Sequence, residues 1–319
     1  MTETMIKVRP PFAFAATARF LRFTEAEAVD TFRDGLYARA FYLKGRLYLV
    51  RVEPRGTAAR PALSLSIAPA KNVTPPILQA AESLVRHIFT VGHDLKNWQQ
   101  QVADDPLLRE LETEHRGLHL ACWPTLFEAL VVSILSQQIS TAVAMTLKRR
   151  VVERFGASLA VDGQTYFAFP RAETMAGATV EDLRALGLSN AKAQSIIELA
   201  RAASRGTLDS NDLKEQDNET VIARLSQLRG IGRWTAEWAL MLYFGRTDIF
   251  PAGDLFLRGA FVKYFNAGVP LAEKEIRARA AERWGRWSSY AALYLLAGMR
   301  AGRITLKPER VVSSQKAGA

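Results

Sequence analysis

The segment Leu225-Ser-Gln-Leu-Arg-Gly-Ile-Gly-Arg-Trp-Thr-Ala236 decides the fold, and Pro251-Ala-Gly-Asp254 follows it downstream. Apolar residues on both sides of Gly230-Ile-Gly232 recur at helical spacing. They predict two helices, over residues 218–228 and 233–244, joined by a tight hairpin. Glycine permits the sharp turn and lets a ligand approach the main chain closely. The unpaired first N–H groups of the second helix suit a phosphate oxygen.

This hairpin is therefore predicted to bind the phosphate backbone of a nucleic acid. Arg229 and Arg233 flank the turn with positive charge, and Ile231 is expected to point inward and anchor it. The carbonyl groups from Leu228 to Gly232 offer a site for a monovalent cation between protein and phosphate. An ordinary glycine-containing connection between two helices is the structural alternative. The predicted DNA-binding residues are Arg229, Gly230, Ile231, Gly232, Arg233 and Thr235.

Asp254 lies in a strongly apolar stretch, where Pro251 and Gly253 predict a loop leading into a helix. A helix N-cap is the structural alternative, because aspartate is favoured there. A carboxylate beside a phosphate-binding turn repels its ligand, which favours a chemical role. Cleavage of an N-glycosidic bond develops oxocarbenium character on the sugar. An ionised carboxylate stabilises that charge and can orient or deprotonate the attacking water. Asp248 competes for this role but is interpreted as a turn residue.

Other chemistries receive no support from the residue types near the hairpin. The histidines all precede residue 120, and no cluster of metal-ligating residues is visible. Cys122 is the only cysteine, which excludes an internal disulfide and an iron–sulfur cluster held by four cysteines of this chain. We expect no required cofactor and no metal site.

Aromatic residues near the hairpin predict a pocket for a base flipped out of a duplex. Trp234 and Trp238 are four residues apart and share one helix face. Indole faces attract cations by roughly 0.5–2 kcal/mol, which suits a positively charged alkylated purine. Burial in an ordinary core is the alternative. Further candidates for this pocket are Tyr243, Trp287 and Tyr290, with Trp284 beside them.

Leu135-Ser-Gln-Gln-Ile-Ser140 interrupts a very apolar helix with two adjacent amides. The structural alternative is a junction between helices with polar caps. The functional prediction is a wedge, a side chain that fills the gap left by a flipped base. Gln138 and Ile139 are the candidates.

Composition sets wider limits. The chain has 319 residues, 49% of them hydrophobic, enough for two or three folded domains. The net charge of +10 and the pI near 9.9 favour a polyanionic partner, with nucleic acid first. No apolar run approaches the roughly 20 residues of a membrane span, and no signal peptide is visible. We expect a cytoplasmic protein without a membrane partner.

Residues 1–104 are predicted to form an α+β domain with a curved sheet. Residues 36–43 and 46–52 suggest a hairpin around Lys44-Gly45, and residues 62–68 alternate with period two. Residues 12–23 look strand-like and residues 25–34 helical. Strand signals stop after residue 104, so residues 105–304 predict an all-α core of two helical subdomains flanking a cleft. Residues 305–319 are expected to form a basic flexible tail.

The motif Leu228-Arg-Gly-Ile-Gly-Arg-Trp-Thr-Ala236, together with Pro251 and Asp254, resembles the helix-hairpin-helix (HhH-GPD) superfamily of DNA glycosylases. Ile134-Leu-Ser-Gln-Gln-Ile-Ser140 is similar to a Gln-containing junction of that superfamily. Gly187-Leu-Ser-Asn-Ala-Lys-Ala193 is similar to its segment before the hairpin. The region around Tyr37-Ala-Arg-Ala-Phe41 resembles the TATA-binding-protein-like domain of the 3-methyladenine DNA glycosylase II branch. The resemblance covers nearly the whole chain.

This resemblance implies a monofunctional DNA glycosylase of base excision repair that hydrolyses the N-glycosidic bond of alkylated bases such as 3-methyladenine and 7-methylguanine. Asp254 falls on the catalytic aspartate. Trp234 falls where bifunctional relatives place a Schiff-base lysine, so strand cleavage by β-elimination is expected to be absent. Trp238 matches an aromatic pocket position and Gln138 the wedge position. Leu296 stands near the place where one branch has a pocket tryptophan.

Two other functions are left open by the sequence. One is a bifunctional oxidised-base glycosylase with lyase activity, which Trp234 disfavours. The other is a non-catalytic helix-hairpin-helix DNA-binding protein, which would have no need for Asp254 in an apolar loop. The expected partner is double-stranded DNA containing alkylated bases, bound by a monomer. A bacterial protein of this kind would associate with the nucleoid.

Overall fold

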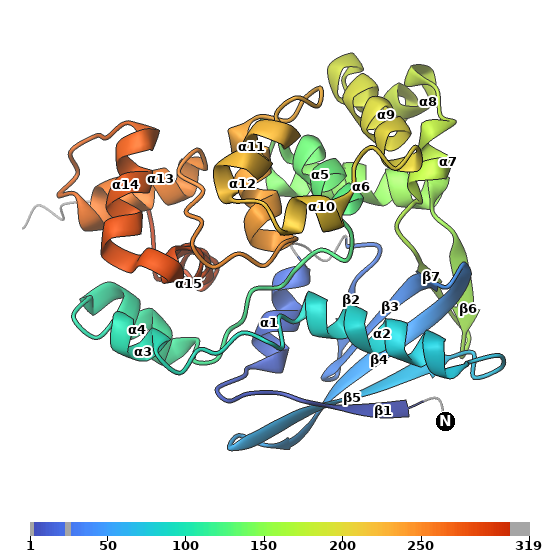
Figure 1. Ribbon diagram of the computed structural model, residues 1–319, viewed down its shortest axis with the longest axis horizontal. Helices are drawn as coiled ribbons and strands as arrows, with labels where there is room; N and C mark the ends of the chain where they lie inside the picture. Colours follow the sequence, from blue (N-terminus) through green and yellow to red (C-terminus); the bar gives the residue numbers. More distant parts are fainter. Residues whose placement is uncertain (1–2, 23–26, 307–319) are drawn as a thin grey trace, which may run out of the picture.

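A computed structural model describes residues 3–22 and 27–306 of the chain (Figure 1). The predicted tail thus lies outside the described residues, apart from Thr305 and Leu306. An antiparallel sheet with two covering helices comes first in the chain, and a mainly helical region follows. The predicted α+β class with a helical core is confirmed.

The N-terminal sheet has five antiparallel strands in the order β1-β5-β4-β3-β2. Its alternating sequence places Tyr37 and Phe41 on the face covered by helices α1 and α2, and Ala38 and Ala40 on the opposite face. The elements of this part are β1 (Glu3–Lys7), α1 (Phe14–Leu21), β2 (Thr31–Arg33), β3 (Leu36–Leu43), β4 (Arg46–Thr57), β5 (Arg60–Ala68) and α2 (Pro75–Ile88).

The prediction for the first forty residues is wrong in two places. The segment predicted as a strand over residues 12–23 contains helix α1, which buries Phe14, Ala18 and Leu21. These positions are spaced at i, i+4 and i+7, the helical period. The segment predicted as helical contains strand β2, which pairs with β3, and residues 23–26 lie outside the described residues. Packing against the sheet decides both short segments.

The helices fall into two groups (Figure 1). The first group surrounds α5 and includes the hairpin helices α11 and α12. The second group lies on the left of Figure 1 and surrounds α15. The first contains α5 (Leu126–Ser136), α6 (Thr141–Phe155), α7 (Ala172–Ala176), α8 (Val180–Ala185), α9 (Asn190–Ser204), α10 (Ser210–Lys214), α11 (Asn218–Leu225) and α12 (Arg233–Leu242). The second contains α3 (Trp98–Gln101), α4 (Pro106–Glu114), α13 (Leu255–Phe265), α14 (Glu273–Trp284), the 3-10 turn η1 (Gly285–Trp287) and α15 (Ser288–Arg300).

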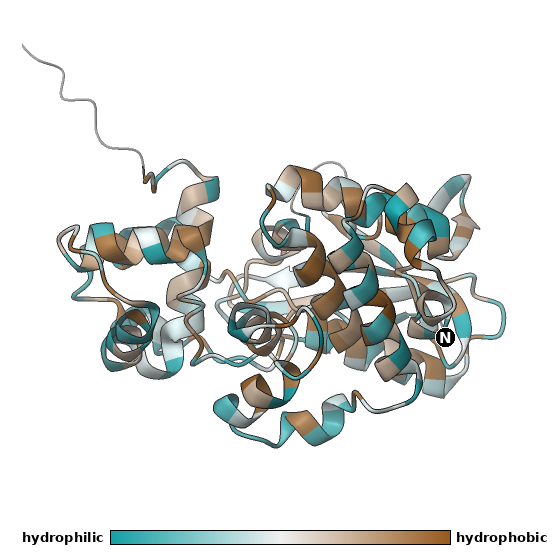
Figure 2. Ribbon diagram, turned by 90° about the horizontal axis from the view of Figure 1, so that it is seen from above, coloured by the Kyte–Doolittle hydropathy of each residue, from teal (hydrophilic) through white to brown (hydrophobic). Residues whose placement is uncertain are grey.

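Buried hydrophobic residues of these helices form one continuous core. The ribbon coloured by hydropathy shows hydrophobic and hydrophilic positions alternating along the helices (Figure 2). Within the described part of the chain, no helix is long and apolar enough to cross a membrane. The segment 243–254 connects the two helical groups and carries Asp254 at its end. The candidate catalytic carboxylate therefore sits where the groups meet.

One hairpin departs from the expected all-helical core. Strands β6 (Ser158–Val161) and β7 (Gln164–Phe167) turn at Asp162-Gly163, where both residues have positive φ. An Asp-Gly pair between two short strands is a strong hairpin signal that the sequence prediction overlooked. Tyr166 of β7 packs on Ala38 and Ala40 of the N-terminal sheet. The hairpin thus fastens the helical region to the sheet.

A buried ion cluster makes a second connection between sheet and helices. Arg39 of β3 donates to Asp30 at 2.9 Å and to Glu128 of α5 at 2.5 Å. Lys148 of α6 binds Glu27 at 2.8 Å. All of these side chains are almost fully buried. The sequence Thr125-Leu-Phe-Glu128 is typical of a capping box, but only the Thr125 half forms, because the Glu128 carboxylate turns to Arg39.

Replacing Arg39 with methionine should lower the free energy of unfolding by about 3–5 kcal/mol, because Asp30 and Glu128 lose their common cation in a dry environment. Arg51→Met is the matched control, since the partner carboxylate Asp162 is 74% exposed and a pair that reaches solvent should contribute about 0–1 kcal/mol. Chemical denaturation of both variants measures the difference. Equal losses of unfolding free energy in the two variants would contradict the expectation that the buried Arg39 cluster stabilises the fold more than a pair that reaches solvent.

Candidate active site

The predicted hairpin is present, and its geometry depends on Gly230. Gly230 has a φ of +76°, and a Cβ at this position would lie 2.5 Å from the Ser195 Oγ of α9. Both the backbone conformation and the close approach therefore require glycine. Ile231 is only 4% exposed, so the prediction that it anchors the turn by pointing inward is confirmed.

Helix α12 begins directly after this turn with no side-chain cap. Gly232 is the N-cap residue, in an extended conformation, and no atom would meet a Cβ built on it. The first N–H groups of α12 therefore have no capping side chain among the described residues. Open N–H groups at the positive end of a helix dipole suit a phosphate oxygen.

Both arginines of the hairpin already contact other side chains of the protein. Arg229 donates to Gln194 at 2.6 Å, and Arg233 pairs with Glu219 and, at 3.5 Å, with Glu237. The contacts of Arg229 with Gln194 and of Arg233 with Glu219 lie at the surface, and surface contacts of this kind are weak enough to exchange for a phosphate, whereas Glu237 is buried. Thr235 is 1% exposed and accepts a hydrogen bond from Gln137, so its side chain supports the turn from inside.

Asp254 is the N-cap of α13, the structural role that was weighed against a chemical one. Its Oδ1 accepts hydrogen bonds from the N–H groups of Phe256 and Leu257, both at 3.0 Å. Both bonds use the same oxygen, so capping leaves Oδ2 for other partners. The Trp234 side chain is close enough to the carboxylate to lower its pKa. Capping and chemistry are thus compatible in one side chain.

Burial raises the pKa of Asp254 above the usual value for aspartate. The N–H groups of Leu257 and Phe256, the Trp234 side chain and the positive charge of Arg258 oppose this shift. A carboxylate with little water around it interacts more strongly with a positive charge that develops beside it. The site therefore suits stabilisation of a cationic sugar.

The two tryptophans of α12 lie next to this carboxylate loop. Trp234 and Trp238 meet edge to face, with ring centroids 6.4 Å apart. A Cβ built on Gly253 would lie 3.3 Å from the Trp234 ring, so the indole packs directly on the residue before Asp254. Both tryptophans remain partly exposed. Their position supports the base-pocket prediction.

The other three aromatic candidates are packed elsewhere. Tyr290 is 0% and Trp287 5% exposed, and both rings pack against Trp98 of α3. Tyr243 packs against His87 of α2 and Phe244. Contacts with α2 and α3 could not be seen in the sequence, because those segments lie more than 140 residues away. We therefore assign these three residues to packing rather than to the base pocket.

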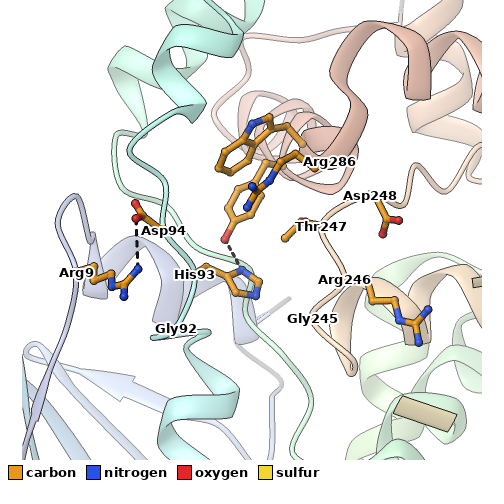
Figure 3. Close-up of a pocket in the computed structure, with 11 residues that line it drawn as sticks. Arg9, Gly92, His93, Asp94, Gly245, Arg246, Thr247, Asp248 and Arg286 are labelled. Atoms are coloured by element: carbon orange, nitrogen blue, oxygen red, sulfur yellow. Dashed lines mark hydrogen bonds and ion pairs between the residues drawn. The ribbon is translucent and has the colours of Figure 1, made fainter. Parts of the chain in front are cut away.

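Trp287 and Tyr290 line a separate cavity of about 760 Å³, whose lining does not include Asp254, Trp234 or Trp238. In this cavity the Tyr290 hydroxyl lies 2.8 Å from Nδ1 of His93 (Figure 3). Burial lowers the pKa of His93 to about 4, so the ring is neutral at pH 7.

Asp248 lines the same cavity and accepts a hydrogen bond from Asn218 at 2.8 Å. It is exposed and lies outside the tryptophan pair, in agreement with its interpretation as a turn residue. Asp254 is therefore the carboxylate that the fold places beside the tryptophans. Across residues 3–22 and 27–306, no three His, Cys, Asp or Glu side chains gather as metal ligands.

The loop between α5 and α6 presents the two wedge candidates to solvent. Gln138 and Ile139 are both exposed, and Gln138 has a positive φ of 59°, which is rare for a residue with a Cβ. Ser140 then caps α6 by accepting from the N–H of Val143. Ser140 thus has the capping role of the structural alternative, while Gln138 and Ile139 stay available as wedge candidates.

Sequence reasoning missed three residues that the fold brings to this region. Gln137 joins the wedge loop to the hairpin by donating to the Gly230 carbonyl at 2.8 Å. Leu255, directly after Asp254, is 74% exposed despite its apolar side chain. Lys192 of α9 reaches the end of α5. Gln137 and Lys192 stand inside motifs of the sequence and Leu255 follows directly after one, but position in a motif does not show which residue a side chain contacts.

Comparison with known proteins agrees with this geometry. Residues 131–286 match the HhH-GPD superfamily of base excision DNA repair proteins, and residues 3–123 match the AlkA N-terminal domain. DNA-3-methyladenine glycosylase of Bacillus subtilis is 33% identical over 217 residues, which cover 67% of this chain and 71% of that protein. DNA-3-methyladenine glycosylase 2 of Escherichia coli is 30% identical over 287 residues, covering 90% and 94%.

A solved structure gives the same result for the whole architecture. The 3-methyladenine DNA glycosylase from Archaeoglobus fulgidus aligns with a TM-score of 0.80 and 28% identity, covering 95% of this chain and 100% of that one. The chain belongs to the HhH-GPD superfamily of base excision DNA repair proteins. It is a DNA glycosylase, and its partner is DNA. The family predicted from the hairpin motif is confirmed.

The two hairpin glycines should respond differently to alanine. Gly230→Ala should lower the melting temperature and weaken binding to duplex DNA, because positive φ costs about 1–2 kcal/mol with a Cβ and Ser195 blocks the new methyl group. Gly232→Ala should lose less stability than Gly230→Ala, since its surroundings are open and only the preference of an N-cap for glycine over alanine is lost. Thermal unfolding and fluorescence anisotropy with labelled duplex test both. Unchanged stability of Gly230→Ala would contradict the hairpin geometry.

Proposed function

We propose that this glycosylase excises alkylated bases of the 3-methyladenine and 7-methylguanine type by monofunctional hydrolysis, with Asp254 as the catalytic carboxylate. The observation that carries the proposal is the Asp254 side chain itself. It is partly buried, it caps α13 through one oxygen, and it lies beside Trp234. The names of the similar proteins from B. subtilis and E. coli support the substrate class.

The reaction needs few protein groups. The bond between the sugar and the base breaks with its electron pair moving to the base, which leaves as a neutral molecule if it was cationic. The ionised Asp254 carboxylate stabilises the positive charge left on the sugar. Water then adds to the cationic sugar and gives up a proton to the same carboxylate, which later releases it to solvent, and an abasic site remains. A cationic leaving base needs no strong general acid.

Trp234 and Trp238 are proposed to hold the flipped base. Their partly exposed indole faces would attract a cationic purine more than a neutral one. Trp234 also occupies the position at which a lyase would need an amine. We therefore propose hydrolysis over the lyase alternative, and the buried carboxylate beside the tryptophans argues against the non-catalytic DNA-binding alternative.

We propose that the turn at Gly230–Gly232 and the open N-terminus of α12 bind the DNA backbone, while Gln138 or Ile139 fills the gap left by the base. A monovalent cation at the carbonyls from Leu228 to Gly232 stays a prediction. It would share the Gly230 carbonyl with Gln137 and the Leu228 carbonyl with the Ile231 N–H group. No other cofactor is proposed. One copy of the chain carries all these parts, so we propose a monomer acting on duplex DNA in the cytoplasm or nucleoid.

Asp254→Asn should reduce the single-turnover release of methylated purines from duplex DNA by about 100-fold or more, because the charge opposite the sugar is lost. Asparagine caps helices as well as aspartate does, so folding and DNA binding should persist. Asp248→Asn is the matched control and should keep full activity. Chromatography of released bases measures the rates, and the strand should stay intact without alkali. Wild-type release by Asp254→Asn would refute the mechanism.

The pH dependence should report the raised pKa of Asp254. Only the ionised form acts, so activity should fall as the pH drops through this pKa, above the usual aspartate value of about 3.9. Release rates measured across the acid range, on DNA corrected for spontaneous depurination, test this expectation. An acid limb at or below the ordinary aspartate range would contradict the proposed burial effect.

A further inference from the structure

We propose that Lys192 of α9 is a positioning residue for base flipping, because it holds the wedge loop at a set place relative to the DNA-binding hairpin. This inference rests on the proposed function, in which the loop carrying Gln138 fills the gap left by the flipped base. Nothing in the sequence motif assigned a role to Lys192. Its contacts in the fold supply one.

Lys192 binds the main chain at the point where α5 ends. Its Nζ donates to the carbonyls of Leu135 and Gln137, both at 2.7 Å. The last carbonyls of a helix have no partner within the helix, and a cation there also favours the negative end of the helix dipole. No carboxylate of residues 3–22 or 27–306 lies within ion-pair distance of Lys192, so the two carbonyls are the acceptors that its ammonium group contacts.

The loop that follows is strained and needs such support. Gln138 has a φ of +59°, a conformation that costs roughly 1–2 kcal/mol with a Cβ. Strained backbone persists where surrounding contacts hold it. Lys192 donates a hydrogen bond to the carbonyl of Gln137, the residue before Gln138, and Ser140 caps helix α6 after it. Release of the Lys192 contact should let the wedge candidates leave their exposed position.

The same helix also supports the hairpin. Ser195, three residues after Lys192 and near it on the helix surface, lies under Gly230, and Gln194 accepts from Arg229. The Gln137 side chain closes the arrangement by donating to the Gly230 carbonyl at 2.8 Å. One rigid helix therefore sets the positions of both the phosphate-binding turn and the wedge loop.

This spacing has a direct consequence for function. When the hairpin binds the DNA backbone, it fixes the position of the duplex relative to the protein. The wedge side chain then reaches the base stack only if its loop stays at a set distance from the hairpin. The contact matters for a base that must leave a stacked duplex. It has little effect on a base in a single strand, because unstacking there costs little.

The test compares Lys192→Met with wild type on two methylated substrates. Single-turnover base release from duplex DNA should fall about tenfold or more, since two partly buried carbonyls lose their donor. Release from single-stranded DNA should change by less than about twofold. Lys192→Arg retains the donors and should keep most duplex activity. Lys71→Met, in the exposed turn between β5 and α2, removes the same charge and should match wild type.

A second readout does not depend on catalysis. A duplex carries 2-aminopurine opposite an abasic-site analogue, and wedge insertion changes its fluorescence on binding. Wild type should produce this change and Lys192→Met should produce little of it. An equal rate loss on both substrates, or wild-type fluorescence in Lys192→Met, would overturn the positioning role. If wild type releases no methylated base at all, the proposed function fails, while the fluorescence comparison still decides the role of Lys192.

Discussion

The carboxylate of Asp254 is held at the N-terminus of α13 by two main-chain N–H groups that share one of its oxygens. This contact orders the start of α13, and it does so at the point where the segment from α12 enters the second group of helices. The capping bonds and the positive end of the helix favour the ionised form, while burial raises the pKa of the carboxylate. The balance leaves a poorly hydrated anion with one oxygen uncommitted to the cap. Such an anion is expensive in an ordinary core, and it is useful where a positive charge must be stabilised.

The surrounding helices hold this anion in a fixed position relative to the proposed DNA-binding turn. Helix α12 begins at that turn and carries Trp234 and Trp238, so the proposed backbone contact and the proposed base pocket share one rigid element. Ion pairs continue this connection, because Glu237 of α12 binds Arg277 of α14, and Glu273 of α14 lies beside Arg258 of α13. Helix α9 contacts the turn through Ser195 and the loop between α5 and α6 through Lys192. Rigid helices therefore fix the distances among the groups that must act together.

The N-terminal sheet domain is joined to the helices in two places. One is the β6–β7 hairpin, and the other is the buried cluster around Arg39, where the sheet, α5 and α6 share charges away from water. A buried cluster of this kind specifies one docking geometry, since any shift leaves a charge without its partner. Helix α5 takes part in this cluster through Glu128, and the proposed wedge loop follows its last residue, Ser136. The domain interface and the wedge loop are thus attached to the same helix.

The local features of this protein were determined by its sequence alone. The Gly-Ile-Gly turn, the inward Ile231 and the aspartate after the hairpin depend on residues close together in the chain, where propensity and spacing decide. Short segments with mixed signals were misjudged, as α1 and the β6–β7 hairpin show. Tertiary structure alone decided which aromatic residues lie beside Asp254, why Glu128 leaves its capping box for Arg39, and what Lys192 binds. Each of these depends on partners many residues away, and side-chain contacts of that kind follow from packing rather than from local pattern.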